Sequence, residues 1–436
     1  MKRLRHIPKL LGAYRQARRL RFTDRAALER RQHALLDGFL RHVAAHSPYY
    51  APYAGQPLAA WPRMDKARML ADFDRINTAG LRLADVMEEA LAAERSRDFA
   101  PLLRGYTVGL SSGTSGRRGV FVVSDAERAA WAGTLLAKAL PGGLFGQVHR
   151  VALLLRANSN LYETVRLPWL KFQFFDLFAP FSDVVAGLAA YRPTVVVAPA
   201  QVLRELALQR DRLGGLPPFQ AISAAEVLDG RDRALIECAF GRVHELYQAT
   251  EGFLAATCSH HRLHLNEEYL HVEPEWLPDA GDGRRRFVPV ITDFSRLTQP
   301  VVRYRLDDIL VAASAPCPCG SATLAIDAVE GRCDDALVLP SARAGDVTVF
   351  ADLVNRALAR TLPPTADYRL VQNEASALRL HTEADAATAA QTLRALREVL
   401  ARQGVNVDAL RVEHAPLDAD FAPTAKRRRI VRACQP

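Results

Sequence analysis

Short apolar runs alternate with longer amphipathic stretches through the middle of the chain. Runs typical of buried strands lie at residues 151–155, 195–198, 221–223 and 243–247. A long Ala-rich helix is expected from Asp125, and another opens near Pro199. Because apolar strands separated by helices are typical of parallel sheets, this pattern predicts a mainly parallel α/β core.

The pattern differs at the two ends of the chain. Residues 1–45 and 82–98 have the Ala/Leu/Arg periodicity of helices, whereas strands and turns dominate from about residue 262. Strand and helix alternate again beyond Gly331. We therefore predict an α/β protein with a large domain at residues 1–330, whose first 100 residues are mainly helical, and a small α+β domain at residues 331–436.

One loop stands out by its composition. Residues 111–119 are only Ser, Thr, Gly and Arg, and they lie between apolar residues at 106–110 and β-branched residues at 120–123. In such a strand–loop–strand segment, small residues let the backbone approach an anion, and hydroxyl and amide groups can surround its oxygens. The loop lacks the Gly-Lys-Ser/Thr ending of the common phosphate loop. A flexible surface loop is the alternative interpretation.

The composition is that of an ordinary soluble enzyme. The chain has 436 residues, enough for two or three domains, with 49% hydrophobic and 24% charged residues. No apolar run approaches the roughly 18–20 residues of a membrane span, and the apolar piece after the basic N-terminus is too short for a signal peptide. A cytoplasmic location is therefore expected. The protein is expected to be a monomer or a homodimer.

The net charge of +9 is concentrated in Arg-rich clusters at residues 15–31, 284–286 and 426–429. Without interleaved aromatic residues or zinc-finger spacing, these clusters do not indicate a nucleic-acid partner. A basic surface suits a polyanionic substrate such as ATP. The Arg-rich N-terminal helix is also compatible with peripheral contact to an anionic membrane.

Several motifs follow the loop in a fixed order. They are Ser-Ala-Ala-Glu at 223–226, Tyr-Gln-Ala-Thr-Glu at 247–251, Arg-Tyr-Arg-Leu-Asp-Asp at 303–308, Gly-Arg-Cys-Asp-Asp at 331–335 and Lys426 within 423–429. This ordered set resembles the adenylate-forming superfamily of acyl-CoA synthetases, and within it the phenylacetate–CoA ligase and coenzyme F390 synthetase-like branch. The resemblance covers nearly the whole chain. It implies a large ATP- and acyl-binding domain and a small mobile C-terminal domain.

The resemblance implies that the loop holds the β- and γ-phosphates of ATP. The implied contacts are Ser111, Ser112, Gly113, Thr114, Ser115, Gly116 and Arg118. The family pattern Thr-Gly-x-Pro-Lys-Gly is not kept at Ser115, Arg117 and Arg118. Arg118 nevertheless retains the positive charge of the usual Lys, on a forked group that suits phosphate.

The motifs after the loop supply the other implied contacts of the nucleotide. Ala225 and Glu226 would border the adenine, and Tyr247 would stack near the adenine or the substrate. Thr250 would contact the α-phosphate, and Glu251 would hold Mg²⁺, a cation that prefers carboxylate oxygens. A plain core aromatic is the alternative interpretation of Tyr247.

The last motifs complete the implied site. Asp308 would accept both ribose hydroxyls, because a carboxylate offers two oxygens, and Arg332 would contact ribose or phosphate. Asp334 matches the hinge between the domains, and Lys426 matches the C-terminal lysine that stabilises charge during adenylation. An ordinary turn carboxylate and a solvated basic tail are the alternatives for Asp334 and Lys426.

The implied reaction has two halves. A carboxylic acid, on branch resemblance an aryl acid, attacks Mg·ATP to give an acyl-AMP and pyrophosphate, and an acceptor then displaces AMP. Coenzyme A is the commonest acceptor in the superfamily, while a carrier-protein thiol, an amine or the amide- and nitrogen–nitrogen-forming chemistry of relatives are alternatives. Transfer of AMP to a hydroxyl, as in F390 synthetases, is another. A catalytically silent binding protein on the same fold is the non-enzymatic alternative.

The six cysteines are spread along the chain, which argues against a disulfide framework. Cys258 precedes two histidines, and Cys317 and Cys319 share a tight turn. Two such turns can form a structural Zn²⁺ site, and similar Cys/His pairs bind zinc in some relatives of the branch. We expect Cys258, Cys317, Cys319 and His260 or His261 as ligands, with His264 assigned to the next strand. Unrelated buried thiols and a surface His pair are the alternative.

Overall fold

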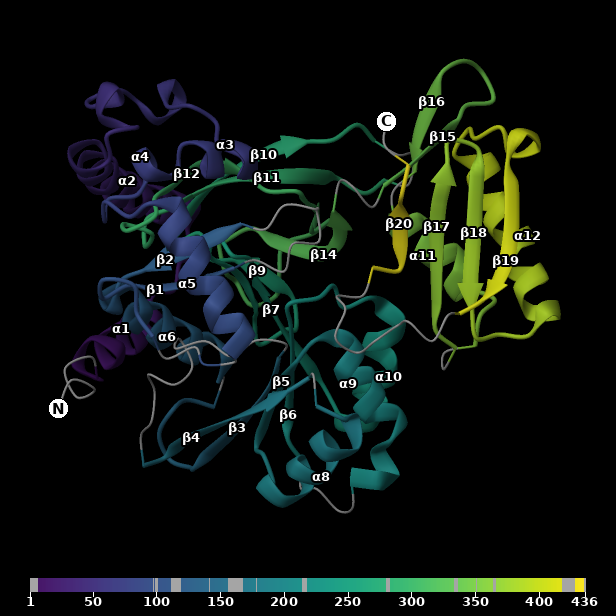
Figure 1. Cartoon of the computed structure of the whole chain (residues 1–436), viewed down its shortest axis with the longest axis horizontal. Helices are drawn as coiled ribbons and strands as arrows, with labels where there is room; N and C mark the ends of the chain where they lie inside the picture. Colours follow the sequence, from purple (N-terminus) through teal and green to yellow (C-terminus); the bar gives the residue numbers. More distant parts are fainter. Residues whose placement is uncertain are drawn as a thin grey trace.

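The fold is seen in a computed structural model of the whole chain (Figure 1). It describes residues 7–96, 98, 101–110, 119–140, 142–155, 168–177, 179–213, 218–279, 283–332, 336–349, 351–363, 366–417 and 428–434. Within this part of the chain, no helix is both long and apolar enough to cross a membrane.

The largest sheet has twelve strands among the described residues, in the order β10-β11-β13-β14-β9-β8-β7-β6-β5-β3-β4, with β12 beside β11. Its parallel part is formed by β3 (His149–Leu155), β4 (Leu170–Asp176), β5 (Val195–Ala198), β6 (Gln220–Ala224) and β7 (Val243–Gln248). The predicted apolar runs coincide with β3, β5, β6 and β7, whereas β4 is a parallel strand that the sequence pattern did not indicate. The predicted α/β class with a parallel core is therefore confirmed.

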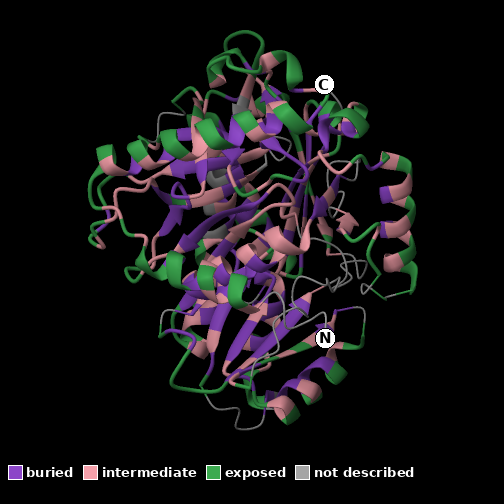
Figure 2. Ribbon diagram, turned by 90° about the vertical axis from the view of Figure 1, so that its left-hand side faces the viewer, coloured by how far each residue is buried: buried purple, intermediate pink, exposed green. Residues whose placement is uncertain are grey.

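The parallel strands are buried on both faces. In β5, Val195 packs in one hydrophobic cluster and Val196 in another, because successive side chains of a strand point to opposite faces. One face is covered by α8 (Phe181–Tyr191), α9 (Ala200–Leu208) and α10 (Gly230–Phe240), near the 3₁₀ turn η4 (Arg210–Leu213). The other face is covered by α6 (Asp125–Ala139) and α1 (Ile7–Arg19). Figure 2 shows buried residues along the strands in the interior and exposed residues on the outer sides of the helices.

Helix α6 begins where the sequence predicts. Ser124 accepts a hydrogen bond from the Glu127 N–H, and the Glu127 carboxylate accepts one from the Ser124 N–H, so the two residues form a capping box. The predicted hairpin precedes this helix as β1 (Thr107–Leu110) and β2 (Val120–Val123), which pair antiparallel. The hairpin brackets the Ser/Thr/Gly/Arg loop, whose residues 111–118 lie outside the described part.

The N-terminal part is mainly helical, as expected. After α1 come α2 (Arg25–His46), η2 (Ala51–Tyr53), η3 (Leu58–Ala60), α3 (Lys66–Ala71), α4 (Phe73–Ile76) and α5 (Leu83–Ser96). Helix α2 is held to the sheet by Gln32, whose side-chain amide donates to the carbonyls of Glu267 and Leu270. Arg25 pairs with Glu267 at 2.8 Å.

The rest of the large sheet is antiparallel. It contains β8 (Phe253–Thr257), β9 (Leu263–Leu265), β10 (Leu270–Trp276), β11 (Arg286–Asp293), β12 (Val301–Arg305), β13 (Asp308–Ala312) and β14 (Ala325–Arg332). Strand β14 lies between β13 and β9, so the chain returns to the middle of the sheet before leaving it.

Two further sheets follow the large one. The first is the pair β15 (Leu337–Pro340) and β16 (Asp346–Val349), and the second has the order β19-β18-β17-β20. The remaining elements are α11 (Ala351–Ala359), β17 (Tyr368–Glu374), β18 (Ala377–Thr382), α12 (Ala386–Arg402), η6 (Val407–Ala409), β19 (Arg411–Pro416) and β20 (Ile430–Arg432). Figure 1 shows this C-terminal part as a separate lobe beside the large sheet. Residues 331–436 as a domain stay a prediction, with β14 ending at Arg332.

Candidate active site

A cavity of about 360 Å³ opens at the carboxyl ends of β6 and β7. In parallel α/β sheets this edge is where ligands bind. The C-terminal lobe supplies part of the wall through Ala351, Asn355 and Arg428 to Ile430. The cavity therefore lies between the large sheet and the C-terminal lobe.

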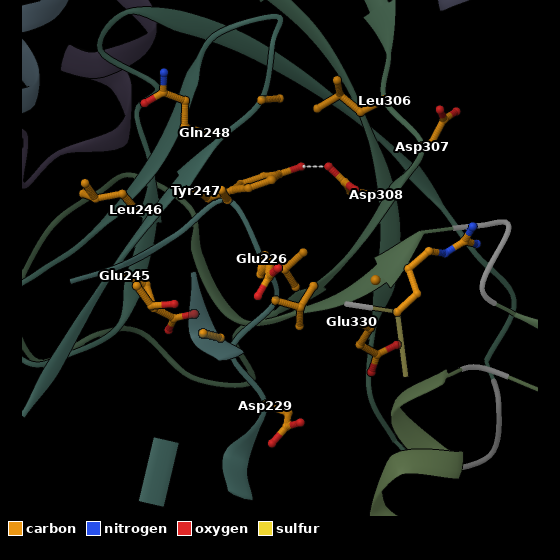
Figure 3. Close-up of a pocket in the computed structure, with 18 of the residues that line it drawn as sticks. Glu226, Asp229, Glu245, Leu246, Tyr247, Gln248, Leu306, Asp307, Asp308 and Glu330 are labelled. Atoms are coloured by element: carbon orange, nitrogen blue, oxygen red, sulfur yellow. Dashed lines mark hydrogen bonds between the residues drawn. The ribbon is translucent and has the colours of Figure 1, made fainter. Parts of the chain in front are cut away.

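Tyr247 and Asp308 meet across this cavity. The Tyr247 hydroxyl donates a hydrogen bond of 2.6 Å to Asp308 Oδ2 (Figure 3). Tyr247 lies near the end of β7, and Asp308 is the first residue of β13, 61 residues later. The bond orients the carboxylate and leaves it able to accept further donors, because each carboxylate oxygen has two lone pairs.

Arg332 lies beside Asp308 at the level of the backbone. The two residues are paired in the antiparallel ladder of β13 and β14. The predicted ribose contacts thus come from neighbouring strands, although the Arg332 side chain lies outside the described part.

Thr250 and Glu251 occupy the turn between β7 and β8, and both line the cavity. Burial raises the pKa of Glu251, and the nearby Asp308 carboxylate adds to this rise, while the Tyr304 hydroxyl and the Lys66 ammonium oppose it. A carboxylate destabilised by burial gains from a cation placed against it. Glu251 is therefore suited to hold a divalent cation.

Ala225 and Glu226 follow β6 on the same side of the cavity. Ala225 has a φ of +68°, in the left-handed region that non-glycine residues seldom adopt. This backbone turn directs the chain along the cavity wall, and the Glu226 carboxylate accepts a hydrogen bond from the Gln201 N–H at 3.3 Å. Strained backbone of this kind clusters at functional sites.

A second cavity, of about 460 Å³, adjoins the first beneath α6. Among the described residues, six line both cavities: Leu110, Ala225, Leu246, Gln248, Ala249 and Thr250. A molecule reaching from one cavity into the other would pass the Thr250 turn.

A Cys/His cluster lies where the turn after β8 and the turn after β13 meet strand β9. The sulfur atoms of Cys258, Cys317 and Cys319 and a ring nitrogen of His264 all lie within 4.8 Å of one another. Cys258 Sγ is 3.7 Å from Cys317 Sγ, and Cys319 Sγ is 3.4 Å from His264 Nε2. Two thiolates on one tetrahedral Zn²⁺, each at about 2.3 Å, would be about 3.8 Å apart, so the spacing fits such an ion.

The histidine that lies beside the three cysteines is His264, and not His260 or His261 as expected from the sequence. His260 is exposed, and its backbone N–H donates to Cys258 Sγ, whereas His261 Nε2 lies 3.0 Å from an Arg242 nitrogen. His264 is only 6% exposed and turns toward Cys319 from the short strand β9. The sequence interpretation assigns His264 to the following strand, and His264 does lie in β9, with its ring beside Cys319.

The surroundings suit His264 and Cys317 for metal binding, whereas burial raises the pKa of the Cys319 thiol to about 11. Burial lowers the pKa of His264, which favours the neutral imidazole, and its Nδ1 lies 3.0 Å from Thr323 Oγ1. A partner on one ring nitrogen fixes the tautomer and presents the other to a metal. For Cys317, burial raises the pKa, but the Cys319 N–H and the two neighbouring thiols outweigh it, so the net pKa is lowered.

The chain matches no protein-family model, and no curated protein matches its sequence. Its structure matches 2-hydroxyisobutyryl-CoA ligase in the postadenylation state with R3-HIB-AMP, with a TM-score of 0.64 and 18% identity, over 94% of this chain and 89% of that one. The chain has the adenylate-forming ligase fold. The same ligase in an open conformation with 2-HIB-AMP and CoA matches with a TM-score of 0.54 and 18% identity, over 91% and 90% of the two chains.

A fatty acyl-adenylate ligase, from work on the enzymes of E. coli and L. pneumophila, matches with a TM-score of 0.50 and 11% identity, over 74% of this chain and 68% of that one. The adenylate-forming fold expected from the order of the motifs is thus confirmed. Membership of the phenylacetate–CoA ligase and F390 synthetase-like branch stays a prediction.

The structure of this adenylate-forming fold brings six predicted residues to one cavity: Ala225, Glu226, Tyr247, Thr250, Glu251 and Asp308. Other predicted residues lie outside the described part, namely Ser111, Ser112, Gly113, Thr114, Ser115, Gly116, Arg118, Asp334 and Lys426. Their roles stay predictions.

Sequence reasoning missed several charged residues of the cavity wall. They are Lys66, Asp229, Asp232, Glu245, Glu330 and Arg429. Arg429 Nη2 lies 3.1 Å from Asp232 Oδ1, and Arg429 also pairs with Asp229. The basic cluster around Lys426 was a signal for Arg429, whereas the acidic residues lie in no recognisable motif.

Proposed function

We propose that this protein is an ATP-dependent adenylate-forming ligase that activates a carboxylic acid. The observation that carries the proposal is the convergence of Tyr247, Glu251 and Asp308 on one cavity of an adenylate-forming fold. Asp308, oriented by Tyr247, would accept the ribose hydroxyls, and Glu251 would hold Mg²⁺. Ala225 and Glu226 would border the adenine.

The chemical step is an in-line displacement. A substrate carboxylate oxygen forms a bond to the α-phosphorus, the bond from that phosphorus to the bridging oxygen breaks, and pyrophosphate leaves with the electron pair. Thr250, which lines both cavities, would contact the α-phosphate where the acid and the nucleotide meet. Mg²⁺ would neutralise charge on the phosphates, and the protein mainly positions the reactants.

The second half-reaction transfers the acyl group to an acceptor. Coenzyme A is the acceptor proposed first, since the structural neighbour described in complex with CoA shares this fold. A carrier-protein thiol, an amine or transfer of AMP to a hydroxyl are the alternatives, and an aryl acid is the substrate suggested by branch resemblance. Lys426 and the 111–118 loop would serve adenylation and phosphate binding.

Acid-dependent exchange between ATP and labelled pyrophosphate tests the proposal. The expected result is exchange that requires a carboxylic acid and Mg²⁺, because pyrophosphate re-forms ATP only from an acyl-AMP. Exchange that is absent across a broad panel of acids would favour a binding protein on the same fold. Products formed with CoA, an amine or hydroxylamine, read by mass spectrometry, would then identify the acceptor.

We propose further that Cys258, His264, Cys317 and Cys319 hold a structural Zn²⁺. The support is the mutual spacing of their ligand atoms and the second partner of His264. The ion would join the turn after β8 to the turn after β13. Among the described residues, neither turn contains a helix or strand that would hold the turn in place.

Metal analysis of protein purified without a His-tag measures this site. We expect about one zinc per chain, loss of zinc in Cys317→Ser, and a lower melting temperature after chelation, because the ion links two turns. The exposed Cys238 provides the control, and Cys238→Ser should keep the zinc. Less than a tenth of an equivalent of zinc in the unaltered protein would contradict the site.

A further inference from the structure

The cavity beneath α6 follows the strands over most of their length. Its wall includes Val151, Leu153 and Leu155 of β3, Val195 and Val197 of β5, and Ile222 and Ala224 of β6. Each set is spaced by two residues, so these side chains share one face of the sheet. The span from Val151 to Leu155 is about 13 Å along a strand.

Helix α6 forms the opposite wall. Its lining residues run from Glu127 and Arg128 in the first turn to Ala139 in the last. At 1.5 Å per residue, the span from Arg128 to Ala139 is about 16 Å. The cavity is therefore elongated, with one end at the Thr250 turn, where it adjoins the nucleotide cavity, and the other near the amino ends of the strands.

The charged residues that the structure describes in this cavity lie on one side of it. Among the described residues, the charged members of its wall are Glu89, Glu94, Glu127, Arg128, Asp293 and Arg296, which come from α5, the first turn of α6 and the end of β11 and the loop after it. The lining residues from β3 to β6 and from the later turns of α6 are uncharged. Because an unpaired charge is costly in an apolar cavity, a charged group on the far end of a ligand would be excluded.

Several apolar side chains between α6 and the sheet are only half-buried, although they lie inside the fold. They are Trp131, Leu135 and Ala139 of α6, and Leu155, Phe172, Val197 and Ala224 of the strands. Protein interiors are close-packed and contain few voids larger than a water molecule. Side chains that face an apolar cavity of about 460 Å³ indicate a site for an apolar ligand.

We infer that the acid substrate carries an elongated, uncharged apolar group that lies under α6, with its carboxylate at the Thr250 turn. This inference rests on the proposed adenylation and refines the substrate class from an aryl acid to a longer acid. Straight-chain acids and acids with a ring on an alkyl linker both carry such an elongated apolar group. An acid with a single ring and no linker would leave the far end of the cavity unfilled.

Acid-dependent exchange with a graded panel tests the inference. The panel is acetate, hexanoate, dodecanoate, benzoate, phenylacetate, a phenylalkanoate of dodecanoate length, and the dicarboxylate of that length. We expect kcat/KM to rise about fourfold for each added methylene until the cavity is full, because each buried methylene adds about the same favourable free energy of transfer from water. The dicarboxylate should be more than a hundredfold poorer than dodecanoate.

Two variants test the location. Val197→Phe fills the middle of the cavity and should lower kcat/KM for dodecanoate at least tenfold while sparing hexanoate. Leu135→Ala enlarges the cavity and should shift the preference toward longer acids. The matched control is Val148→Phe, at a residue that is 47% exposed and outside both cavities, and it should change neither acid.

Calorimetric binding of dodecanoate without ATP gives a readout independent of chemistry, and circular dichroism checks that each variant is folded. A preference for acetate or benzoate, with exchange intact, would overturn the inference and leave the proposed adenylation standing. Equal effects of Val197→Phe and Val148→Phe would also overturn it. If none of the acids supports exchange, but dodecanoate binds and Val197→Phe weakens that binding, the proposed function is overturned and the apolar site stands.

Discussion

At the scale of single residues, the bond between Tyr247 and Asp308 is the contact that organises the candidate nucleotide site. Sequence interpretation found both residues, but assigned them separate roles at the adenine and the ribose. Their hydrogen bond could not be predicted, because 61 residues separate them and only the sheet brings them together. The position of His264 beside the cysteines was missed for a related reason, since the direction of a strand side chain depends on tertiary pairing.

Removing the Asp308 charge should weaken nucleotide binding. We expect Asp308→Asn to raise KM for ATP about tenfold to a hundredfold, because hydrogen bonds to a charged group contribute about 1.5–3 kcal/mol. Tyr247→Phe should raise KM by less, about twofold to tenfold, because it removes one neutral donor. Steady-state exchange kinetics measure both changes.

The control for this pair is Asp37→Asn, at an exposed residue of α2 outside the cavity. It should leave KM for ATP unchanged. A KM in Asp308→Asn within twofold of the unaltered protein would contradict the ribose role of Asp308.

At the scale of elements, the strands and helices were predicted well where the signal is local. The apolar runs became β3, β5, β6 and β7, and the polar start of α6 became a capping box. The pairing of α1 with α6 and the position of β14 between β13 and β9 were not predicted, because they join distant segments. Helical periodicity gives the buried face of α1 but not the partner that covers it.

Glu127 illustrates how a local signal can have a distant consequence. Besides capping α6, its carboxylate accepts hydrogen bonds from the N–H groups of Leu297 and Thr298, at 2.7 and 2.8 Å. Burial raises its pKa, but the hydrogen bonds from Ser124 and Thr298 outweigh this, and the net pKa is lowered. The capping residue therefore also fixes the loop after β11 against the start of α6.

The contact between α1 and α6 depends on Gly133. A Cβ at this position would lie 2.3 Å from the Leu10 carbonyl oxygen, so the two helices could not keep their distance. We expect Gly133→Ala to lower the free energy of unfolding by about 1–3 kcal/mol. Urea unfolding measures this change, and hydrogen exchange in α1 reports whether that helix loosens.

Gly38 is the matched control, as a glycine inside α2 with open space around its missing Cβ. Gly38→Ala should stabilise the protein by about 0.5–1 kcal/mol, because alanine loses less backbone entropy in a helix. A Gly133→Ala variant as stable as Gly38→Ala would contradict the close packing of α1 on α6.

At the scale of the whole molecule, the C-terminal lobe is held against the candidate nucleotide site by ion pairs. Arg429 contacts Asp229 and Asp232 at the start of α10, and Arg231 Nη2 donates to the Leu362 carbonyl at 3.2 Å. Both guanidiniums lie over the Tyr368 ring. A rotation of the lobe, as the family resemblance implies, would have to break these contacts.

The arrangement of the lobe could be anticipated only in outline. The sequence indicated a second domain beyond residue 330 through the change of pattern at Gly331 and Arg332, and β14 ends at Arg332. The acidic partners of Arg429 carry no motif. Asp229 and Asp232 lie at the start of α10, and their pairing with Arg429 depends on the position of the C-terminal lobe.

The proposed reaction bonds a substrate carboxylate oxygen to the α-phosphorus of ATP. The most direct measurement uses an acid labelled with oxygen-18 in its carboxylate, with hydroxylamine as the acceptor, and mass spectrometry of the nucleotide product. We predict AMP that carries one labelled oxygen, because the carboxylate oxygen stays on phosphorus when the acceptor displaces AMP. Unlabelled AMP, or ADP with labelled phosphate, would contradict adenylation.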